Sequence, residues 1–193
     1  MLENHDLNTF ARWYAFYVQV RHEKKVDDRL AKKEIEVFTP MISRLKQWSD
    51  RKKMVQEPLI RGYVFCKIAL ENRMEVLETP GVLNILKFAG KWAPIPDYQI
   101  DTLRIMIEHP ETLQPENYVK VGEYVRVIAG PFTGAHGIVQ RMPGADRLVL
   151  RLDKIQLAFS VEVSRNDIKV LKPEEIETET AEMTGNSGYW RRP

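Results

Sequence analysis

The glycine-rich stretch VIAGPFTGAHGIV, at positions 127–139, constrains the fold more than any other part of this sequence. Gly130, Gly134 and Gly137 lie within eight positions and are flanked by β-branched residues. A phosphate-binding loop needs Lys and Ser/Thr directly after its last glycine, at the start of a helix. Here an Ile-Val pair follows and continues a strand. The stretch therefore predicts a turn, in which Gly130-Pro131 reverses the chain and the other two glycines meet a positive φ or a close contact.

Short strands without any helical pattern surround this turn. They are expected at 123–129, 137–142, 147–152, 155–163 and 167–171. Five strands in about 55 residues are typical of a small closed or half-closed barrel. Phe132 at the tip of the turn, with Ile138 and Phe159, can either fill the barrel core or contact a partner, and the sequence leaves both open for these three residues.

The first hundred residues mix both kinds of element. Strands are expected at 12–20, 35–41 and 62–68, and helices at 21–35, 69–79 and 97–109, with short extended pieces between 83 and 96. A hairpin is expected within 42–60, with turn residues Ser49 and Asp50 in its middle. This order predicts an α+β domain with helices packed on a mostly antiparallel sheet.

Composition changes divide the chain into four parts. Residues 11–110 form the α+β domain, and residues 111–117, with Pro115 in a segment without apolar periodicity, are expected to be a linker. Residues 118–172 form the barrel. The acidic and then polar tail, 173–193, is expected to be disordered.

The net charge of +2 conceals an alternation along the chain. Residues 12–67 hold 14 Lys/Arg against 7 Asp/Glu, whereas residues 68–117 hold 4 against 8 and residues 118–172 hold 9 against 5. Such blocks are compatible with solvated surfaces or with a negatively charged partner such as a nucleic acid.

The residues that enzymes and metal sites need are scattered. The four histidines have no partner at metal-ligand spacing, no nucleophile elbow is present, and Cys66 is the single cysteine. We expect Cys66 to be an inert thiol within a strand and His136 to be solvated in the glycine turn. The sequence predicts no enzyme, no cofactor and no metal. It also lacks a signal peptide and a bilayer-spanning apolar run, so we expect a cytoplasmic protein that does not bind membranes.

Two sets of motifs resemble one protein family. VGEYVRVIAGPFTGAHGIV resembles the KOW motif of NusG-family transcription factors, in which a strand, a Gly-Pro-Phe turn and a glycine before the next strand recur. WYAFYVQVRHEKKV, EPLIRGYVF and TPGVLNILKFAGKWAPIP resemble, in the right order, segments of the NGN domain of the same family. The likeness spans about residues 12–172. Arg61 departs from it, because many members have proline or asparagine there.

The resemblance implies a transcription elongation factor that acts without bond chemistry. The NGN domain of such factors binds the clamp helices of the largest RNA polymerase subunit and keeps the clamp closed, which opposes pausing and termination. Its contact surface is an apolar, partly aromatic hollow. By position, the candidates for polymerase contact are Trp13, Tyr14, Leu59, Ile60 and Tyr63. A core role stays open for these residues, Trp13 above all, while the family match favours surface contact for Ile60.

The resemblance also brings the basic hairpin close to polymerase and DNA. Its candidate nucleic-acid contacts, on upstream or non-template DNA, are Arg44, Lys46, Trp48, Arg51, Lys52 and Lys53, joined by Arg73 from the short helix. Trp48 can stack on an unpaired base or pack within the hairpin. The basic residues can equally serve to keep an exposed strand edge soluble.

The resemblance leaves the second domain's partner open among a ribosomal protein, a termination factor and RNA. The acidic tail, the departure at Arg61 and the divergent sequence favour a specialised antiterminator, monomeric and similar to the UpxY-type regulators of surface-polysaccharide operons. A general NusG-type factor that couples polymerase to the ribosome or to a termination factor is the alternative. A KOW-containing protein that binds ribosomal RNA is the rival from another class, against which the NGN-like half argues.

Overall fold

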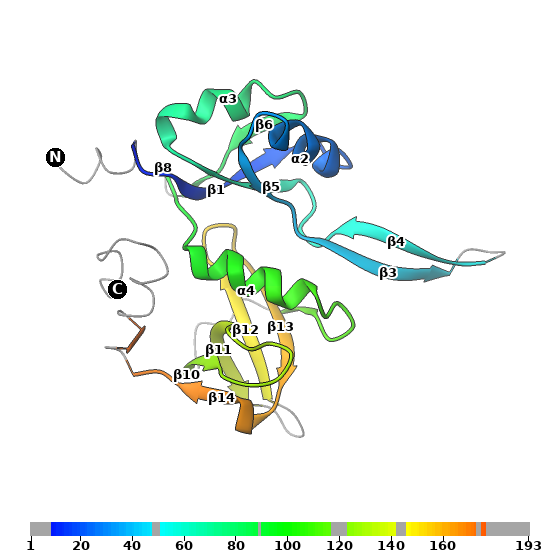
Figure 1. Ribbon diagram of the computed structural model, residues 1–193, viewed down its shortest axis with the longest axis vertical. Coiled ribbons are helices and arrows are strands. Elements are labelled where there is room, and N and C mark those ends of the chain that lie inside the picture. The colour runs from blue at the N-terminus through cyan, green and yellow to red at the C-terminus, as the bar shows by residue number, and fades with distance from the viewer. Residues whose placement is uncertain are drawn as a thin grey trace. The chain divides into compact units, whose positions relative to one another are not determined.

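The structure is a computed structural model that describes residues 9–47, 51–88, 90–116, 123–141, 146–172 and 175–176. The chain divides into two compact units, residues 1–95 and 96–193. Helices and antiparallel sheets occur together, as the α+β prediction required (Figure 1). No helix in the described ranges is long and apolar enough to cross a membrane.

A four-stranded antiparallel sheet forms the centre of the first unit. Its strands, in spatial order, are β2 (Glu36–Phe38), β5 (Tyr63–Ile68), β1 (Arg12–Val18) and β6 (Val82–Ile85). The two long apolar strands, β1 and β5, occupy the middle, where both neighbours saturate their main-chain hydrogen bonds. Both strands lie within segments that the sequence predicts to be strands, 12–20 and 62–68.

Two helical segments accompany this sheet. They are α2 (Glu23–Ala31) and a 3₁₀ turn (Leu70–Asn72) that continues into α3 (Arg73–Leu77). In α2, Val26 and Leu30 lie four residues apart on one face, and both are completely buried in a core that includes Tyr14 and Phe16 of β1. The narrow apolar stripe of α2 therefore packs in the core against one face of this sheet.

The basic hairpin is present as a separate two-stranded ribbon. Strands β3 (Met41–Gln47) and β4 (Lys52–Pro58) pair with each other along their whole length and with no other described strand. A smaller ribbon consists of β7 (Lys87–Phe88) and β8 (Lys91–Trp92), which precede and follow Gly90. Figure 1 shows β3 and β4 extending away from the four-stranded sheet of the first unit.

The second unit consists of helix α4 (Asp97–Ile107) and a six-stranded antiparallel sheet. The strands, in spatial order, are β14 (Ile168–Val170), β10 (Glu123–Val127), β11 (His136–Arg141), β12 (Asp146–Leu152), β13 (Leu157–Val163) and β9 (Gln114–Glu116). Strands β10 to β14 match the five expected ones. Strand β9 was not expected, because Pro115 and the lack of periodicity gave it the character of a linker; it pairs through Phe159↔Pro115 at the sheet edge, where a proline is tolerated.

Helix α4 packs against β11 and β12. The hydroxyl of Thr102 accepts a hydrogen bond of 2.9 Å from the main-chain N–H of His136. Tyr98 lies near the rings of Tyr124 and His136, with centroids 6.3 and 6.4 Å away. A helix expected in the first domain therefore lies in the same compact unit as the second sheet. Of the predicted disordered tail, 173–193, only Glu175 and Ile176 are among the described residues.

Candidate functional site

The predicted polymerase-contact residues divide into buried and half-exposed ones. Trp13 and Ile60 are each 2% exposed, and Tyr14 is fully enclosed in the core of the first unit. Ile60 was expected at the surface; the structure corrects this, because the side chain is buried just after the end of β4. Leu59 and Tyr63 are half-buried and keep part of their side chains accessible.

Tyr63 belongs to an aromatic pair that the sequence did not single out. Tyr17 of β1 is its partner across the strand pair, and the two ring centroids are 4.8 Å apart. Burial, followed by a hydrogen bond with Tyr17, raises the pKa of the Tyr63 hydroxyl, so this hydroxyl stays neutral at physiological pH. Tyr17 remains 38% exposed. The sequence does not single out Tyr17 by an alternation of apolar and polar residues, because β1 is apolar at nearly every position.

The backbone beside Tyr63 is held in a tight turn. Gly62 has a φ of +76° and donates its N–H to Glu23 Oε1 at 2.8 Å, while its carbonyl accepts from Val18 N–H at 2.9 Å. A Cβ at Gly62 would lie 3.9 Å from Val20 Cγ2, and Val20 is 61% exposed. We call Tyr17, Val20 and Tyr63 the aromatic patch, an apolar surface at one end of the β1–β5 pair.

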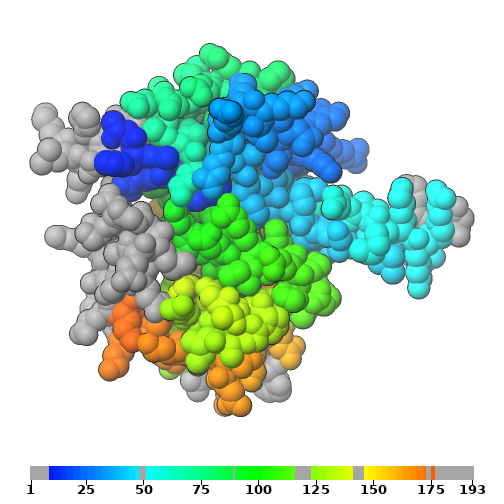
Figure 2. All heavy atoms as spheres, viewed as in Figure 1, coloured from blue at the N-terminus to red at the C-terminus, as the bar shows by residue number. Residues whose placement is uncertain are grey.

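The ribbon of β3 and β4 carries most of the predicted nucleic-acid contacts. Arg44, Lys46, Arg51, Lys52 and Lys53 are all exposed, whereas Trp48 lies outside the described residues. Lys46 Nζ bonds Glu57 Oε2 at 2.5 Å, and this contact is the main cause that lowers the Glu57 pKa. Arg61, the residue that departs from the family pattern, lies 3.8 Å from the same carboxylate. Cationic side chains thus follow the ribbon on both strands, and Figure 2 shows the ribbon projecting from the rest of the first unit.

Arg73 lies apart from the ribbon, at the start of α3. Its guanidinium donates to the carbonyl of Leu70 at 3.0 Å, so part of its hydrogen-bonding capacity serves the helix start. The structure does not bring Arg73 together with the ribbon cations into a single described cluster.

The glycine turn has the predicted conformation. Gly130 and Gly134 have φ values of +80° and +89°, and a Cβ at Gly137 would lie 2.6 Å from the carbonyl oxygen of Val149 on the next strand. Phe132, after Pro131, is 4% exposed and meets the ring of His109 edge-on at 5.1 Å. The turn therefore serves the packing of the second unit.

Three residues left open between core and contact roles are core residues here. Phe132 and Phe159 are each 4% exposed and Ile138 is 8% exposed. His136 was expected to be solvated, and this prediction is wrong: the residue is 4% exposed, with its ring 6.5 Å from that of Tyr124. The packing of α4 on β11, which local sequence does not reveal, encloses it.

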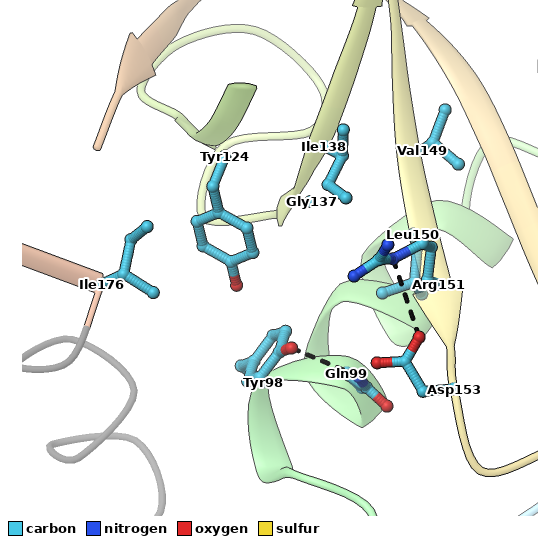
Figure 3. Close-up of a pocket in the computed structure, with 10 residues that line it drawn as sticks. All are labelled: Tyr98, Gln99, Tyr124, Gly137, Ile138, Val149, Leu150, Arg151, Asp153 and Ile176. Atoms are coloured by element: carbon cyan, nitrogen blue, oxygen red, sulfur yellow. Dashed lines mark hydrogen bonds and ion pairs between the residues drawn. The ribbon is translucent and has the colours of Figure 1, made fainter. Parts of the chain in front are cut away.

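A cavity of about 220 Å³ lies within the second unit. Figure 3 shows Tyr98 of α4 below Tyr124, Gln99 beside Asp153, and Ile176 at one side. The amide of Gln99 donates to the Tyr98 hydroxyl at 3.2 Å. The lining is mainly apolar, and its charged members, Arg151 and Asp153, face each other at 3.6 Å. This arrangement contains no nucleophile placed against a base.

The remaining reactive groups fit no catalytic or metal site in the described ranges. Burial, and secondarily the charge of Asp27, raises the pKa of the Cys66 thiol, which is fully enclosed between β1 and β2. A thiol with a raised pKa is a poor nucleophile. Among the residues that the structure describes, no group of three His, Cys, Asp or Glu side chains is arranged to hold a metal ion.

Comparison with known proteins gives the family of this chain. The family model for "Transcription termination factor nusG" matches residues 11–104. The transcription termination/antitermination protein NusG of Staphylococcus carnosus is 31% identical over 177 residues, which is 83% of this chain and 96% of that protein. The protein of the same name from Pseudomonas aeruginosa is 26% identical over 144 residues, covering 68% and 81% of the two chains.

A solved structure described as "Domain interaction in Thermotoga maritima NusG" covers 84% of this chain and 98% of its own, with 20% identity and a TM-score of 0.41. The sequence matches establish the family, because the Staphylococcus carnosus relative is 31% identical and 96% of its length is matched. The chain belongs to the NusG family of transcription termination/antitermination factors.

Proposed function

We propose that this protein binds RNA polymerase during elongation and suppresses pausing and termination. The observation that carries the proposal is the aromatic patch of Tyr17, Val20 and Tyr63, an exposed apolar surface at the end of the central strands of the region that matches the family model. Tyrosine is enriched in the energetically dominant parts of protein interfaces, because it buries a large rigid surface and keeps one polar group. The proposed partner surface is the clamp helices of the largest polymerase subunit.

The other predicted contact residues have a place in this proposal. Leu59, half-buried, extends the patch toward the ribbon. Trp13, Tyr14 and Ile60 are enclosed, so in this proposal they stabilise the domain that carries the patch and do not themselves contact polymerase. The basic side chains of the β3–β4 hairpin contact upstream or non-template DNA. Polymerase and DNA are then both bound by the first domain.

The second unit supplies a further binding module. We infer that its strands β10 to β14 form the SH3-like barrel of a KOW domain and bind a ribosomal protein, a termination factor or RNA. Exposed apolar groups there include Ile128 in the turn region and Val170 on β14, with exposed fractions of 53% and 48%. Arg61 and the acidic tail favour an antiterminator that acts on a particular set of operons, such as those for surface polysaccharides.

The test is in vitro transcription on a template with a long leader and a terminator, with purified polymerase. The unmodified protein should increase read-through, and the Tyr17→Ala/Tyr63→Ala variant should bind polymerase at least about tenfold more weakly, since aromatic interface residues carry on the order of 2 kcal/mol. Val170→Ala, an exposed apolar change in the other unit, is the matched control and should leave polymerase affinity unchanged.

Two results would contradict the proposal. One is unchanged read-through together with no polymerase in a pull-down from lysate. The other is full polymerase affinity in the double tyrosine variant, which would move the contact surface elsewhere. Ribosomal RNA recovered in place of polymerase would support the rival function.

A further inference from the structure

The turn between β1 and α2 holds a charged residue in a conformation that usually belongs to glycine. Residues 19–22 form this turn, which is closed by a hydrogen bond of 2.9 Å from the His22 N–H to the Gln19 carbonyl. Arg21, at the third position of the turn, has a φ of +69°. A type II turn demands a positive φ at that position, and glycine or asparagine ordinarily supplies it. An arginine there is strained, because the Cβ of an L-residue then approaches the following carbonyl oxygen.

The contacts on either side of the turn fix this conformation. Gln19 donates its N–H to the Gly81 carbonyl at 2.9 Å. Glu23, directly after the turn, is buried and accepts a hydrogen bond of 2.8 Å from the Gly62 N–H. Backbone strain of this kind persists only where the surroundings over-determine it, and it is concentrated at functional sites. Glycine would allow the same turn with less strain, so the side chain of Arg21 needs an explanation of its own.

Arg21 borders the aromatic patch, because it directly follows Val20 of that patch. The residue is exposed, and its guanidinium makes no hydrogen bond or ion pair to any residue that the structure describes. Arg61 differs in this respect, since its guanidinium lies 3.8 Å from the carboxylate of Glu57. The charge of Arg21 is therefore available to a partner molecule that covers the patch.

Strain alone does not indicate a binding role. Besides glycines and Arg21, the described residues with a positive φ are Glu34 and Gln156. Glu34 follows the end of α2, and its N–H bonds the Ala31 carbonyl at 3.0 Å, as residues after a helix end commonly do. Position distinguishes Arg21 from these two residues, because it lies beside an exposed apolar surface.

A partner that covers the aromatic patch brings its own atoms next to the Arg21 guanidinium. A charge that loses water at such a contact is stabilised when it meets an opposite charge. The planar guanidinium suits a carboxylate, with which it can form two parallel hydrogen bonds. Because the surface beside Arg21 is apolar, a protein fits it better than the phosphates of a nucleic acid do.

We propose that Arg21 is a specificity-determining residue of the aromatic patch, and that it pairs with an Asp or Glu side chain of the protein that covers this patch. The inference rests on the proposed function, in which that protein is RNA polymerase.

The test measures binding of the full chain to polymerase core enzyme that is free of nucleic acid, at several salt concentrations. Arg21→Asn should weaken binding at least about fivefold and make it less dependent on salt, because charges at the rim of an interface act through screened electrostatics. Asparagine tolerates a positive φ, so the turn is kept. Arg21→Lys retains the charge without the planar fork and should recover part of the affinity. Tyr17→Ala should weaken binding without changing its salt dependence.

Glu34→Asn is the matched control, because it makes the same exchange of a charged residue for asparagine at a positive φ in the same unit. Both asparagine variants should unfold at a urea concentration equal to or higher than that of the unmodified protein. Glu34→Asn should bind polymerase as the unmodified protein does. A lower unfolding midpoint for Arg21→Asn would give this side chain a structural role and overturn the inference.

Three further results would overturn the inference alone, with polymerase binding by the unmodified protein intact. They are an unchanged affinity of Arg21→Asn for the core enzyme, an unchanged salt dependence, and a loss of affinity that occurs only when the polymerase carries DNA, which would assign Arg21 to a phosphate. If the unmodified protein does not bind the core enzyme, the proposed function fails and this inference fails with it.

Discussion

Gly137 lies where two strands of the second unit approach most closely. It pairs with Val125 of β10, and a Cβ in its place would lie 2.6 Å from the carbonyl oxygen of Val149 and 3.2 Å from a methyl group of Leu148. The atom that would have to move is backbone, which rotamer changes cannot relieve. Gly134 differs, because its requirement is a φ of +89° and only Ile105 is near.

Gly137→Ala should therefore destabilise the protein by about 2 kcal/mol or more, as overpacked positions do. Gly134→Asn is the matched control, since asparagine tolerates positive φ and the space is open, and should cost less than about 1 kcal/mol. Urea unfolding of both variants, followed by circular dichroism, measures the difference. Equal stability of Gly137→Ala and the unmodified protein would show that β11 and β12 do not approach so closely.

At the scale of the element, the ribbon is stabilised by its own cross-strand pairs. Among the described strands, β3 and β4 pair only with each other. A two-stranded ribbon is only marginally stable, so side-chain pairs such as Lys46–Glu57 contribute to it. The hydrogen bond from Lys46 lowers the Glu57 pKa, which means that the ionised carboxylate is favoured in the folded ribbon.

The contribution of Glu57 is present above the pKa of the unfolded chain, about 4.3, and is lost as the pH falls through the lower folded value. Hydrogen exchange of the ribbon amides should therefore accelerate as the pH is lowered from about 6 to 3, after correction for the intrinsic rate. Glu57→Gln should flatten this pH dependence. An equal pH response in Glu57→Gln would assign it to another acid.

At the scale of the whole molecule, the division of the chain is the main question. The sequence draws a boundary at residue 110, whereas the contacts within the chain divide it between residues 95 and 96. Helix α4 lies between these two boundaries. Strand β9 follows it, between residues 110 and 118. They pack and pair with the sheet of the second unit through Thr102–His136 and Phe159↔Pro115.

Two fragments of the chain measure how much helix α4 and strand β9 stabilise the second unit. A fragment of residues 96–176 should be more stable than one of residues 118–176 by at least about 3 kcal/mol, because Tyr98, Leu103 and Met106 of α4 are buried and each such side chain contributes about 1.5–3 kcal/mol. Denaturant unfolding of both fragments measures this. Equal stabilities would favour the boundary at 110 and an independent sheet of strands β10 to β14.

The sequence by itself determined the kind and order of most elements, the turn chemistry at 127–139 and the family, because periodicity, glycine placement and motifs are properties of neighbouring residues. It did not reveal Tyr17, since an all-apolar β1 shows no alternation that tells one face from the other. The burial of His136 and Ile60 and the strand at 114–116 were decided by the tertiary structure alone. Each depends on which distant segment packs or pairs against a residue, and local sequence carries no record of that choice.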